Sequence, residues 1–145
     1  MNPILKPYHQ GGLVLKNRLV MAPMTRSRAL DNLPNALMAQ YYGQRSGAGL
    51  IITEGTATSP EALGYARMPG IFTAAQTEGW KQVTAAVHAG HSKIFLQLLH
   101  TGRMGHVDNL PDGVQLVGPT SLAAAGQIYT DTAGKQDHSQ PVALT

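Results

Sequence analysis

The chain has 145 residues, of which 43% are hydrophobic and 13% charged, so it can form one domain with a core and is not an intrinsically disordered protein. Its formal charge of +3 comes from basic residues scattered along the sequence, whereas nucleic-acid-binding surfaces cluster them, so we expect no nucleic-acid partner; an anionic small molecule explains the charge equally well. The absence of cysteine excludes disulfides, a thiol nucleophile and cysteine-bound zinc.

The first elements predicted along the chain are a hairpin arm, a strand and a helix. Residues 13–15 are typical of a short extended arm, and residues 18–22 predict a strand that Pro23 ends. Residues 34–45 have a helical pattern, since proline suits a first helical turn. The helix face expected to be buried comprises Leu37, Met38, Tyr41 and Tyr42.

A second, short strand is predicted at residues 50–53. Glu54 and Gly55 would end this strand, and residues 56–71, which contain several prolines and glycines, predict a loop. The glycines of residues 47–49 precede the strand instead of joining a strand to a helix. This context does not fit a dinucleotide-binding glycine fingerprint.

A second helix and a third strand follow. Thr73 and Gln76 match a capping box, and Gly90 lies just past the end of the helix that the box opens. Core positions at helical spacing in this helix are Trp80, Val83 and Val87. Residues 93–99 form an apolar run typical of a buried strand. The alternation of strands and helices predicts an α/β fold with a parallel sheet and right-handed crossovers.

The pattern becomes less regular after residue 100. Residues 110–113 predict a turn, and residues 114–117 a short strand. Residues 127–130 resemble the start of a small surface excursion, and residues 138–141 are extended or loop. A long polar segment with little regular structure is unusual for a complete compact domain.

Neither the N-terminal residues nor the apolar runs indicate a secretory or membrane segment. The longest apolar runs are too short to cross a bilayer, and the N-terminal residues lack the basic-then-apolar layout of a signal peptide. We therefore expect a soluble, cytoplasmic protein with no membrane partner.

Polar or small residues follow or interrupt each predicted strand. Thr25 follows the first strand, Gly55 follows the second, and Gln97 lies within the third. The carboxyl ends of parallel strands share one rim, where barrels and open α/β sheets bind ligands. Gly55 would let backbone approach a ligand closely, and the side chains of Thr25 and Gln97 can both donate and accept at the edge of a planar heteroaromatic ring. Gln97 could equally serve only to satisfy neighbouring backbone groups.

Other candidate motifs are weak. His88 and His91 have no acidic partner nearby, so we expect no metal site. Glu54 could act as a general acid or base, or could pair with a neighbouring arginine. His100 and Arg103 could bind an anion, although a structural role suits them better.

The sequence resembles the Old Yellow Enzyme family of FMN-dependent ene reductases in a series of ordered motifs. The matching motifs, in chain order, are residues 17–26, 41–45, 49–55, 64–65 and 95–103. Each motif alone is weakly specific, but the whole series at suitable spacing is specific. Residues beyond 103 fit more loosely.

This resemblance implies a flavin bound over a (β/α)8 TIM barrel. Pro23, Met24 and Thr25 would line the isoalloxazine, with the Thr25 hydroxyl near the flavin C4 carbonyl, where a hydrogen bond raises the reduction potential. Gly55 would bring its backbone close to the ring, and Gln97 would bond the pyrimidine edge.

The resemblance also implies an activity and a substrate pocket. NAD(P)H would reduce FMN, which would transfer hydride to the activated C=C bond of an α,β-unsaturated carbonyl or nitro compound. Tyr65 would lie in the substrate pocket together with Leu99. Many relatives carry tryptophan at the position of Leu99, so the smaller side chain should widen this pocket.

The family's His and His or Asn substrate anchor, its proton-donating Tyr and its phosphate site have no match in this sequence. A closed barrel of this kind needs eight strands and about 250 residues. We therefore expect residues 1–145 to be an incomplete N-terminal segment of a single FMN-binding TIM-barrel domain, with about three βα units plus a loop and a completing C-terminal chain as partner. The alternatives are a non-catalytic half-barrel that needs a second chain to bind flavin and act, and a different flavin or phosphate barrel enzyme.

Overall fold

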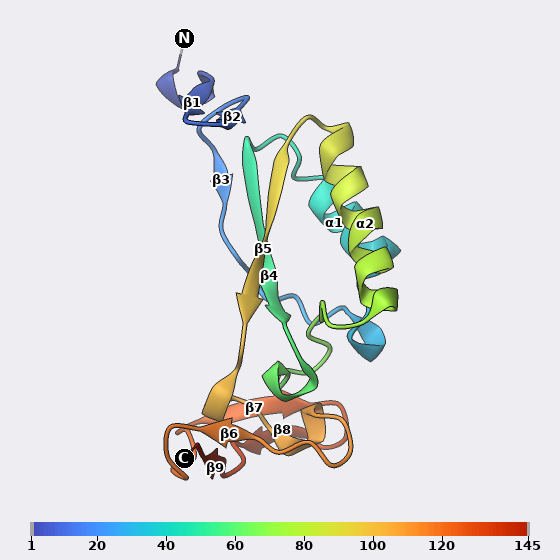
Figure 1. Ribbon diagram of the computed structural model, residues 1–145, viewed down its shortest axis with the longest axis vertical. Helices are drawn as coiled ribbons and strands as arrows, with labels where there is room; N and C mark the ends of the chain where they lie inside the picture. Colours follow the sequence, from blue (N-terminus) through green and yellow to red (C-terminus); the bar gives the residue numbers. More distant parts are fainter. Residues whose placement is uncertain (1, 145) are drawn as a thin grey trace.

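The computed structural model describes residues 2–144 and is built around a three-stranded parallel sheet. The strands lie in the order β3-β4-β5 (Val20–Met21, Leu50–Ala57 and Lys93–Leu99). Two helices, α1 (Ala36–Gly43) and α2 (Ala74–Ala89), both lie on one side of the sheet (Figure 1). The alternation of parallel strands and helices confirms the predicted α/β class.

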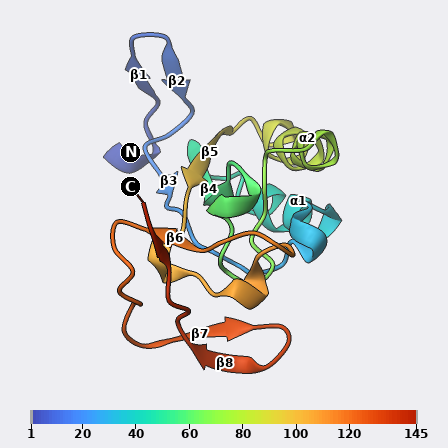
Figure 2. The same cartoon turned by 60° about the horizontal axis from the view of Figure 1, so that its bottom comes forward.

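The shorter strands lie at the two ends of the sheet (Figures 1 and 2). An antiparallel hairpin, β1 (Tyr8–Gln10) with β2 (Leu13–Leu15), lies at the amino ends of the sheet strands, and Gly11 forms its turn with φ +55°. At the carboxyl ends lie the parallel pair β6–β9 and the antiparallel hairpin β7–β8. The bounds of these strands are β6 Val117–Gly118, β7 Gln127–Thr130, β8 Gly134–Asp137 and β9 Val142–Ala143. No helix in residues 2–144 has the length and apolar character needed to span a membrane.

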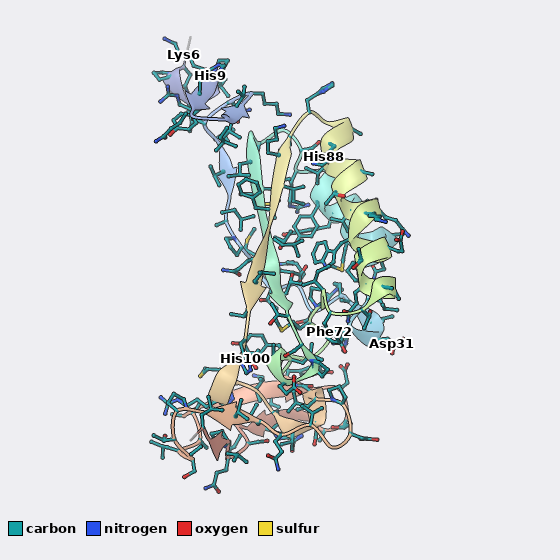
Figure 3. The ribbon with its side chains drawn as sticks, in the orientation of Figure 1. Lys6, His9, Asp31, Phe72, His88 and His100 are labelled. Carbon is teal, nitrogen blue, oxygen red and sulfur yellow. The ribbon has the colours of Figure 1, made fainter. Side chains whose placement is uncertain are left out.

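The main core lies between the sheet and the two helices, where side chains fill the layer (Figure 3). It comprises Ala29, Met38, Tyr42, Ile51, Trp80, Val83 and Val87. Burial of this apolar surface is the principal force that holds α1 and α2 on the sheet. The indole Nε1 of Trp80 is not left unpaired, because it donates a hydrogen bond to the carbonyl oxygen of Gly70 at 3.0 Å.

The α2 helix forms as the sequence predicts. Thr73 Oγ1 accepts a hydrogen bond from the Gln76 amide at 3.1 Å, and Gln76 Oε1 accepts from the Thr73 amide at 3.0 Å, which completes the capping box. Gly90 is the C-cap residue. The predicted core positions are confirmed, since Trp80, Val83 and Val87 are all buried.

The α1 helix is shorter than predicted and buries a narrower face. It begins at Ala36, because Asn35 is the N-cap and its Oδ1 accepts from the Met38 amide at 3.2 Å. Met38 and Tyr42, one turn apart, face the core, whereas Leu37 is 55% exposed. The prediction that Leu37 shares the buried face was therefore wrong.

Strand β4 is longer than predicted, because Glu54 and Gly55 lie inside it. Ile52 pairs with Phe95 and Gly55 with Gln97, so three steps along β4 span two steps along β5. This is a β-bulge, which accommodates an extra residue without ending the strand. Glu54, which was expected to end the strand, is tolerated inside it because its buried carboxylate has hydrogen-bond partners.

Two other strands, by contrast, are shorter than predicted. The strand expected at residues 18–22 is reduced to β3. It begins later than predicted because the Leu19 amide donates a hydrogen bond to Asn17 Oδ1 at 3.1 Å, and not to a partner strand. The strand expected at residues 114–117 is instead β6 at Val117–Gly118, which pairs with β9. The excursion predicted near residue 127 is the β7–β8 hairpin.

The side of the sheet opposite the helices is open in the described part of the chain. Ile94 and Leu96 pack against the helical core, so the alternating Phe95 points to the other face, where it is 53% exposed. Val20 is 52% exposed in the same way, since its neighbour Met21 packs on the core. Within residues 2–144, β3 and β5 each pair only with β4.

Candidate active site

The predicted site residues lie at the carboxyl ends of the three parallel strands. The chain leaves β3 through Pro23, Met24 and Thr25, of which Pro23 is half-buried and the other two are exposed. β4 and β5 run in the same direction and end beside the β6–β9 region (Figure 1). The predicted residues therefore occupy the rim at which α/β proteins bind ligands.

Thr25 and Tyr65 line one open hollow of about 390 Å³. Its lining residues are Thr25, Ser27, Tyr65, Ala66, Ile128 and Tyr129. The sequence singled out Thr25 and Tyr65 but not the two residues from β7. Alternation in residues 127–130 marks a strand, but no local pattern indicates that this strand lies against the Thr25 rim.

Gly55, Gln97 and Leu99 form a second group beside the first. Gly55 pairs with Gln97 across the β4–β5 ladder. A Cβ atom on Gly55 would lie 2.5 Å from Leu99 Cδ2, so this backbone is in close contact with the Leu99 side chain. Leu99 and Tyr65 are both partly buried against the small cluster of Ala57, Ala62, Leu63 and Met68, which links the two groups.

The rim also has polar groups without partners in the protein. Neither the Thr25 hydroxyl nor the side-chain amide of Gln97 forms a hydrogen bond within residues 2–144, although the backbone amide of Gln97 donates to Thr53 Oγ1 at 3.1 Å. Each side chain can donate and accept. Such groups, together with a glycine backbone and the exposed Met24, suit the polar edge and apolar face of a flavin ring.

Glu54 is buried behind this rim, on the helical side, and is 1% exposed. Its Oε2 accepts from the Arg26 amide at 3.0 Å and its Oε1 from the Tyr42 hydroxyl at 3.1 Å, while the Glu54 amide donates to the Tyr42 oxygen at 2.8 Å. Burial raises the pKa of Glu54, although these donors and the charges of Arg26 and Arg28 act in the opposite direction. Burial and the Glu54 charge also raise the pKa of Tyr42.

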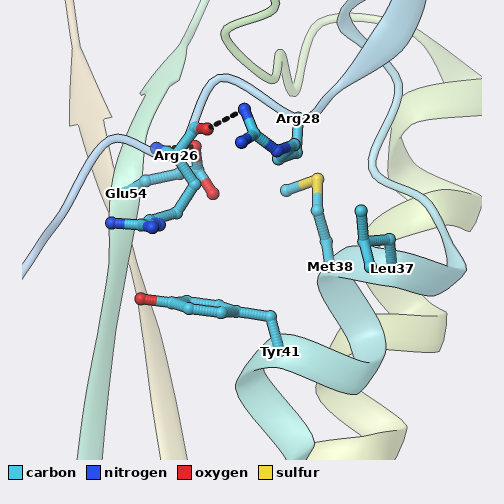
Figure 4. A pocket seen from close by; sticks show the side chains of 6 residues that line it. All are labelled: Arg26, Arg28, Leu37, Met38, Tyr41 and Glu54. Carbon is cyan, nitrogen blue, oxygen red and sulfur yellow. Dashed lines mark hydrogen bonds between the residues drawn. The ribbon is translucent and has the colours of Figure 1, made fainter.

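A cavity of about 140 Å³ lies next to Glu54 (Figure 4). It is lined by Arg26, Arg28, Leu37, Met38, Tyr41 and Glu54. Arg28 does not form an ion pair with the carboxylate; its Nη1 donates to the carbonyl oxygens of Arg26 and Ser27, both at 3.0 Å. The sequence left open whether Glu54 acts as a general acid or base or pairs with a neighbouring arginine. Instead of an ion pair with an arginine side chain, the structure shows a hydrogen bond to the Glu54 carboxylate from the backbone amide of Arg26.

The β7–β8 hairpin is attached to the loop that carries Tyr65. Arg67 Nε donates to both carboxylate oxygens of Asp131 at 3.0 Å, and Tyr129 lies under the Arg67 guanidinium, 6.0 Å from its centre. The Arg67 guanidinium lowers the pKa of Asp131. A second attachment is made by Asn109, whose Nδ2 donates to the carbonyl oxygens of Gly64 and Tyr129, each at 3.0 Å.

The remaining candidates do not join the rim site. His100 Nδ1 accepts from the Gly102 amide at 3.0 Å, which is a local structural role. Arg103 is exposed. His88, at the end of α2, lies far from the carboxyl rim (Figure 3), and no group of acidic or histidine side chains in the described range is arranged to hold a metal ion.

The sequence matches the NADH:flavin oxidoreductase / NADH oxidase family over residues 3–140. The chain belongs to this family. It is 42% identical over 133 residues to 12-oxophytodienoate reductase 1 of Oryza sativa subsp. japonica, a match that covers 91% of this chain and 34% of that protein. Chanoclavine-I aldehyde reductase of Penicillium roqueforti is 43% identical over 138 residues, with coverage of 92% and 37%.

Solved structures of related proteins have the same fold. Morphinone reductase is 48% identical, with a TM-score of 0.89 over 100% of this chain and 40% of that one. The old yellow enzyme homologue from Zymomonas mobilis is 43% identical, with a TM-score of 0.90 and coverage of 98% and 39%. The predicted resemblance to the Old Yellow Enzyme family is confirmed, and the chain spans about a third to two fifths of the length of these relatives.

Proposed function

We propose that this chain provides part of the flavin and substrate pocket of an ene reductase, within a single FMN-binding TIM-barrel domain that further strands complete. The observation that carries the proposal is the shared rim. Thr25 follows β3, and Gln97 pairs with Gly55 near the carboxyl ends of the adjacent parallel strands β5 and β4; the side chains of Thr25 and Gln97 are unpaired within residues 2–144. Membership of a flavin oxidoreductase family supports the assignment of this rim to FMN.

Bound FMN would supply the redox chemistry, in which it is reduced by NAD(P)H and passes hydride to the activated C=C bond of an α,β-unsaturated carbonyl or nitro compound. Thr25 would donate a hydrogen bond to the flavin and so favour its reduced, negatively charged form. Gln97 and the Gly55 backbone would orient the ring, and Pro23 and Met24 would contact it. Tyr65 and Leu99 shape the space for the alkene, and Leu99 leaves more of it open than a larger aromatic residue would.

A second candidate is a half-barrel that binds flavin and acts only after a second chain completes it. The open sheet face favours this arrangement, because Phe95 and Val20 on that face are about half exposed. Exposed apolar strands invite pairing with further strands. The same surface would be covered in one continuous barrel, so the two candidates differ in whether the completing strands belong to another polypeptide.

The test is a visible absorbance spectrum of the purified protein, with the intact mass of every polypeptide in the sample. We expect a bound-flavin spectrum whenever the barrel is complete, with a second polypeptide present if the barrel is split. A complete barrel that neither binds FMN nor is purified with it would contradict the proposal.

The role of Thr25 is tested in the flavin-bound protein with Thr25→Ala and the matched control Thr25→Ser, which keeps the hydroxyl. Thr25→Ala should lower the FMN reduction potential, slow flavin reduction and speed flavin reoxidation by the alkene, whereas Thr25→Ser should remain near wild type. Equal potentials and equal half-reaction rates in wild type and Thr25→Ala would exclude this role.

A further inference from the structure

The bulge in β4 turns Glu54 away from the open face of the sheet. Regular alternation after Ile51, which packs on the helical core, would leave Glu54 on the side opposite the helices. The extra residue between Ile52 and Gly55 changes this, and the Glu54 carboxylate instead meets Tyr42 of α1. Bulges commonly re-aim a side chain next to an active site.

The Glu54 carboxylate holds the loop that carries Thr25. The Arg26 amide, which donates to Glu54 Oε2 at 3.0 Å, belongs to the peptide unit that begins at Thr25. Tyr42 is 0% exposed, and its hydroxyl holds the other carboxylate oxygen. This peptide unit is therefore fixed to β4 and α1 from the side opposite the hollow that Thr25 lines.

The loop needs such a fixed point, because it has no ladder partner and contains an unfavourable backbone conformation. β3 ends at Met21, and Ser27 adopts φ +53°, which is costly for a residue other than glycine. The Arg28 guanidinium braces the carbonyl oxygens of Arg26 and Ser27 on the outer side (Figure 4 shows the bond to Arg26). A conformation of this kind persists only where its surroundings determine it.

The same bulge also holds Gln97. Thr53, the residue before Glu54, accepts a hydrogen bond from the Gln97 amide at 3.1 Å, and its hydroxyl donates to the Glu54 carbonyl oxygen at 3.0 Å. Adjacent residues of one bulge thus secure the neighbouring segments that carry Thr25 and Gln97. Glu54 itself is buried and does not line the hollow that Thr25 lines.

We propose that Glu54 is a positioning residue, whose carboxylate, held by Tyr42, fixes the Thr25–Arg26 peptide unit and so sets the Thr25 hydroxyl for the flavin. The last step rests on the proposed function of Thr25, whereas the anchoring of the loop does not. A buried pair that only stabilised the fold would have no specific coupling to Thr25.

The test combines a measurement without flavin and one with it. The first is hydrogen exchange of the Arg26 amide in the apoprotein, which we expect to be about tenfold faster in Glu54→Ala and nearer wild type in Glu54→Gln, since glutamine keeps an acceptor oxygen. The second is the FMN reduction potential in the holoprotein. It should fall in Glu54→Ala, and Thr25→Ala should cause a smaller further shift in the Glu54→Ala background than in wild type.

Val87→Ala is the control, because it removes buried volume from α2 without touching the rim. It should destabilise the protein without changing the potential. If Glu54→Ala does not fold, Tyr42→Phe is the alternative, because it removes the Tyr42 hydroxyl and leaves the Arg26 amide as the donor to the carboxylate. We then expect smaller changes of the same sign in both measurements.

Wild-type exchange at Arg26 in a folded Glu54→Ala or Tyr42→Phe variant would overturn the proposal, as would fully additive potential shifts in the double variant. A different result separates the two proposals. If Thr25→Ala leaves the potential unchanged, the proposed function of Thr25 fails, while faster Arg26 exchange in Glu54→Ala still establishes that Glu54 positions this loop.

Discussion

The α/β part of the chain (residues 18–99) and the segment that follows it (residues 100–144) are stabilised by different interactions. The first has a buried apolar cluster that includes Ile51, Trp80 and Val83. The second has fewer buried apolar side chains, Leu116 and Ile128, and many polar contacts: Asp108 Oδ2, for example, accepts from Thr132 at 2.8 Å and from Gln136 at 2.9 Å. The rim site thus joins a half supported by an apolar core to a half that depends more on polar contacts.

The largest test of this comparison is Trp80→Ala. Trp80 is 3% exposed and donates to the Gly70 carbonyl oxygen, so its truncation leaves a cavity and an unpaired acceptor. We expect a loss of about 3–5 kcal/mol in the free energy of unfolding, measured by urea denaturation. Leu37→Ala is the control and should stay within about 0.5 kcal/mol, because Leu37 is already exposed. Similar losses in the two variants would mean that this cluster does not dominate stability.

The same contrast explains which elements the sequence could predict. The α2 helix has apolar residues at regular helical spacing, a capping box and a terminal glycine, and these signals agree with its bounds in the structure. The end of β4 was mispredicted, because Glu54 has a strand-breaking character that only its partners Tyr42 and Arg26, distant in sequence, offset. Local propensity does not contain such tertiary contacts.

The candidate site was predictable to a similar extent. Thr25 follows β3, and Gly55 and Gln97 lie close to the carboxyl ends of β4 and β5; parallel topology places these ends together, so the sequence indicated the rim. The contribution of Ile128 and Tyr129 depends on where the β7–β8 hairpin lies. Its position is set by Arg67 and Asn109 through polar contacts that leave no periodic pattern in the sequence.

Tyr42→Phe tests the polar group inside the core-supported half. The substitution keeps the buried ring but removes the hydroxyl, which leaves Glu54 Oε1 and the Glu54 amide without these partners. We expect a loss of about 1–3 kcal/mol in the free energy of unfolding. Tyr41→Phe is the matched control on the same helix, since Tyr41 is only half-buried and contacts Arg45 through its ring. A loss in Tyr41→Phe as large as that in Tyr42→Phe would show that the Glu54 contact is not the cause.

The pH dependence of stability tests Glu54 directly. Burial raises the pKa of Glu54 above its ordinary value of 4.5, so the folded protein binds this proton more tightly than the unfolded chain. The resulting stabilisation is complete below about pH 4.5 and is lost as the pH rises through the raised pKa. Wild type should therefore lose stability relative to Glu54→Gln over this window, as measured by thermal unfolding at a series of pH values.

The Glu54→Gln comparison is needed because other carboxyls act in the opposite direction. Hydrogen bonds and nearby cations lower the pKa of Asp108 and Asp131, so their stabilisation is present above the ordinary Asp value of 3.8 and is lost as the pH falls. Subtracting the Glu54→Gln profile from wild type removes both contributions. A wild-type profile parallel to that of Glu54→Gln between about pH 4.5 and neutrality would contradict the raised pKa.

The smallest expected effect is that of Asp131→Asn in the polar half. Its side chain is 48% exposed and that of Arg67 is 32% exposed, so water and salt screen the pair and global stability should change little. Locally, however, this pair ties the β7–β8 hairpin to the Tyr65 loop. We expect faster amide hydrogen exchange in residues 127–137, with unchanged exchange in β4 and β5, and a smaller difference from wild type at about 1 M salt.

Lys81→Ala is the control, because it breaks an ion pair with Glu78 that is more open to solvent, lies within α2 and joins no two segments. It should leave exchange in residues 127–137 unchanged. If Asp131→Asn instead accelerated exchange in β4 and β5 as well, the hairpin and the sheet would open as one cooperative unit. The β7–β8 side of the hollow would then be as stable against local opening as the Thr25 side. Tyr129 would line the hollow as part of the same cooperative unit as Thr25.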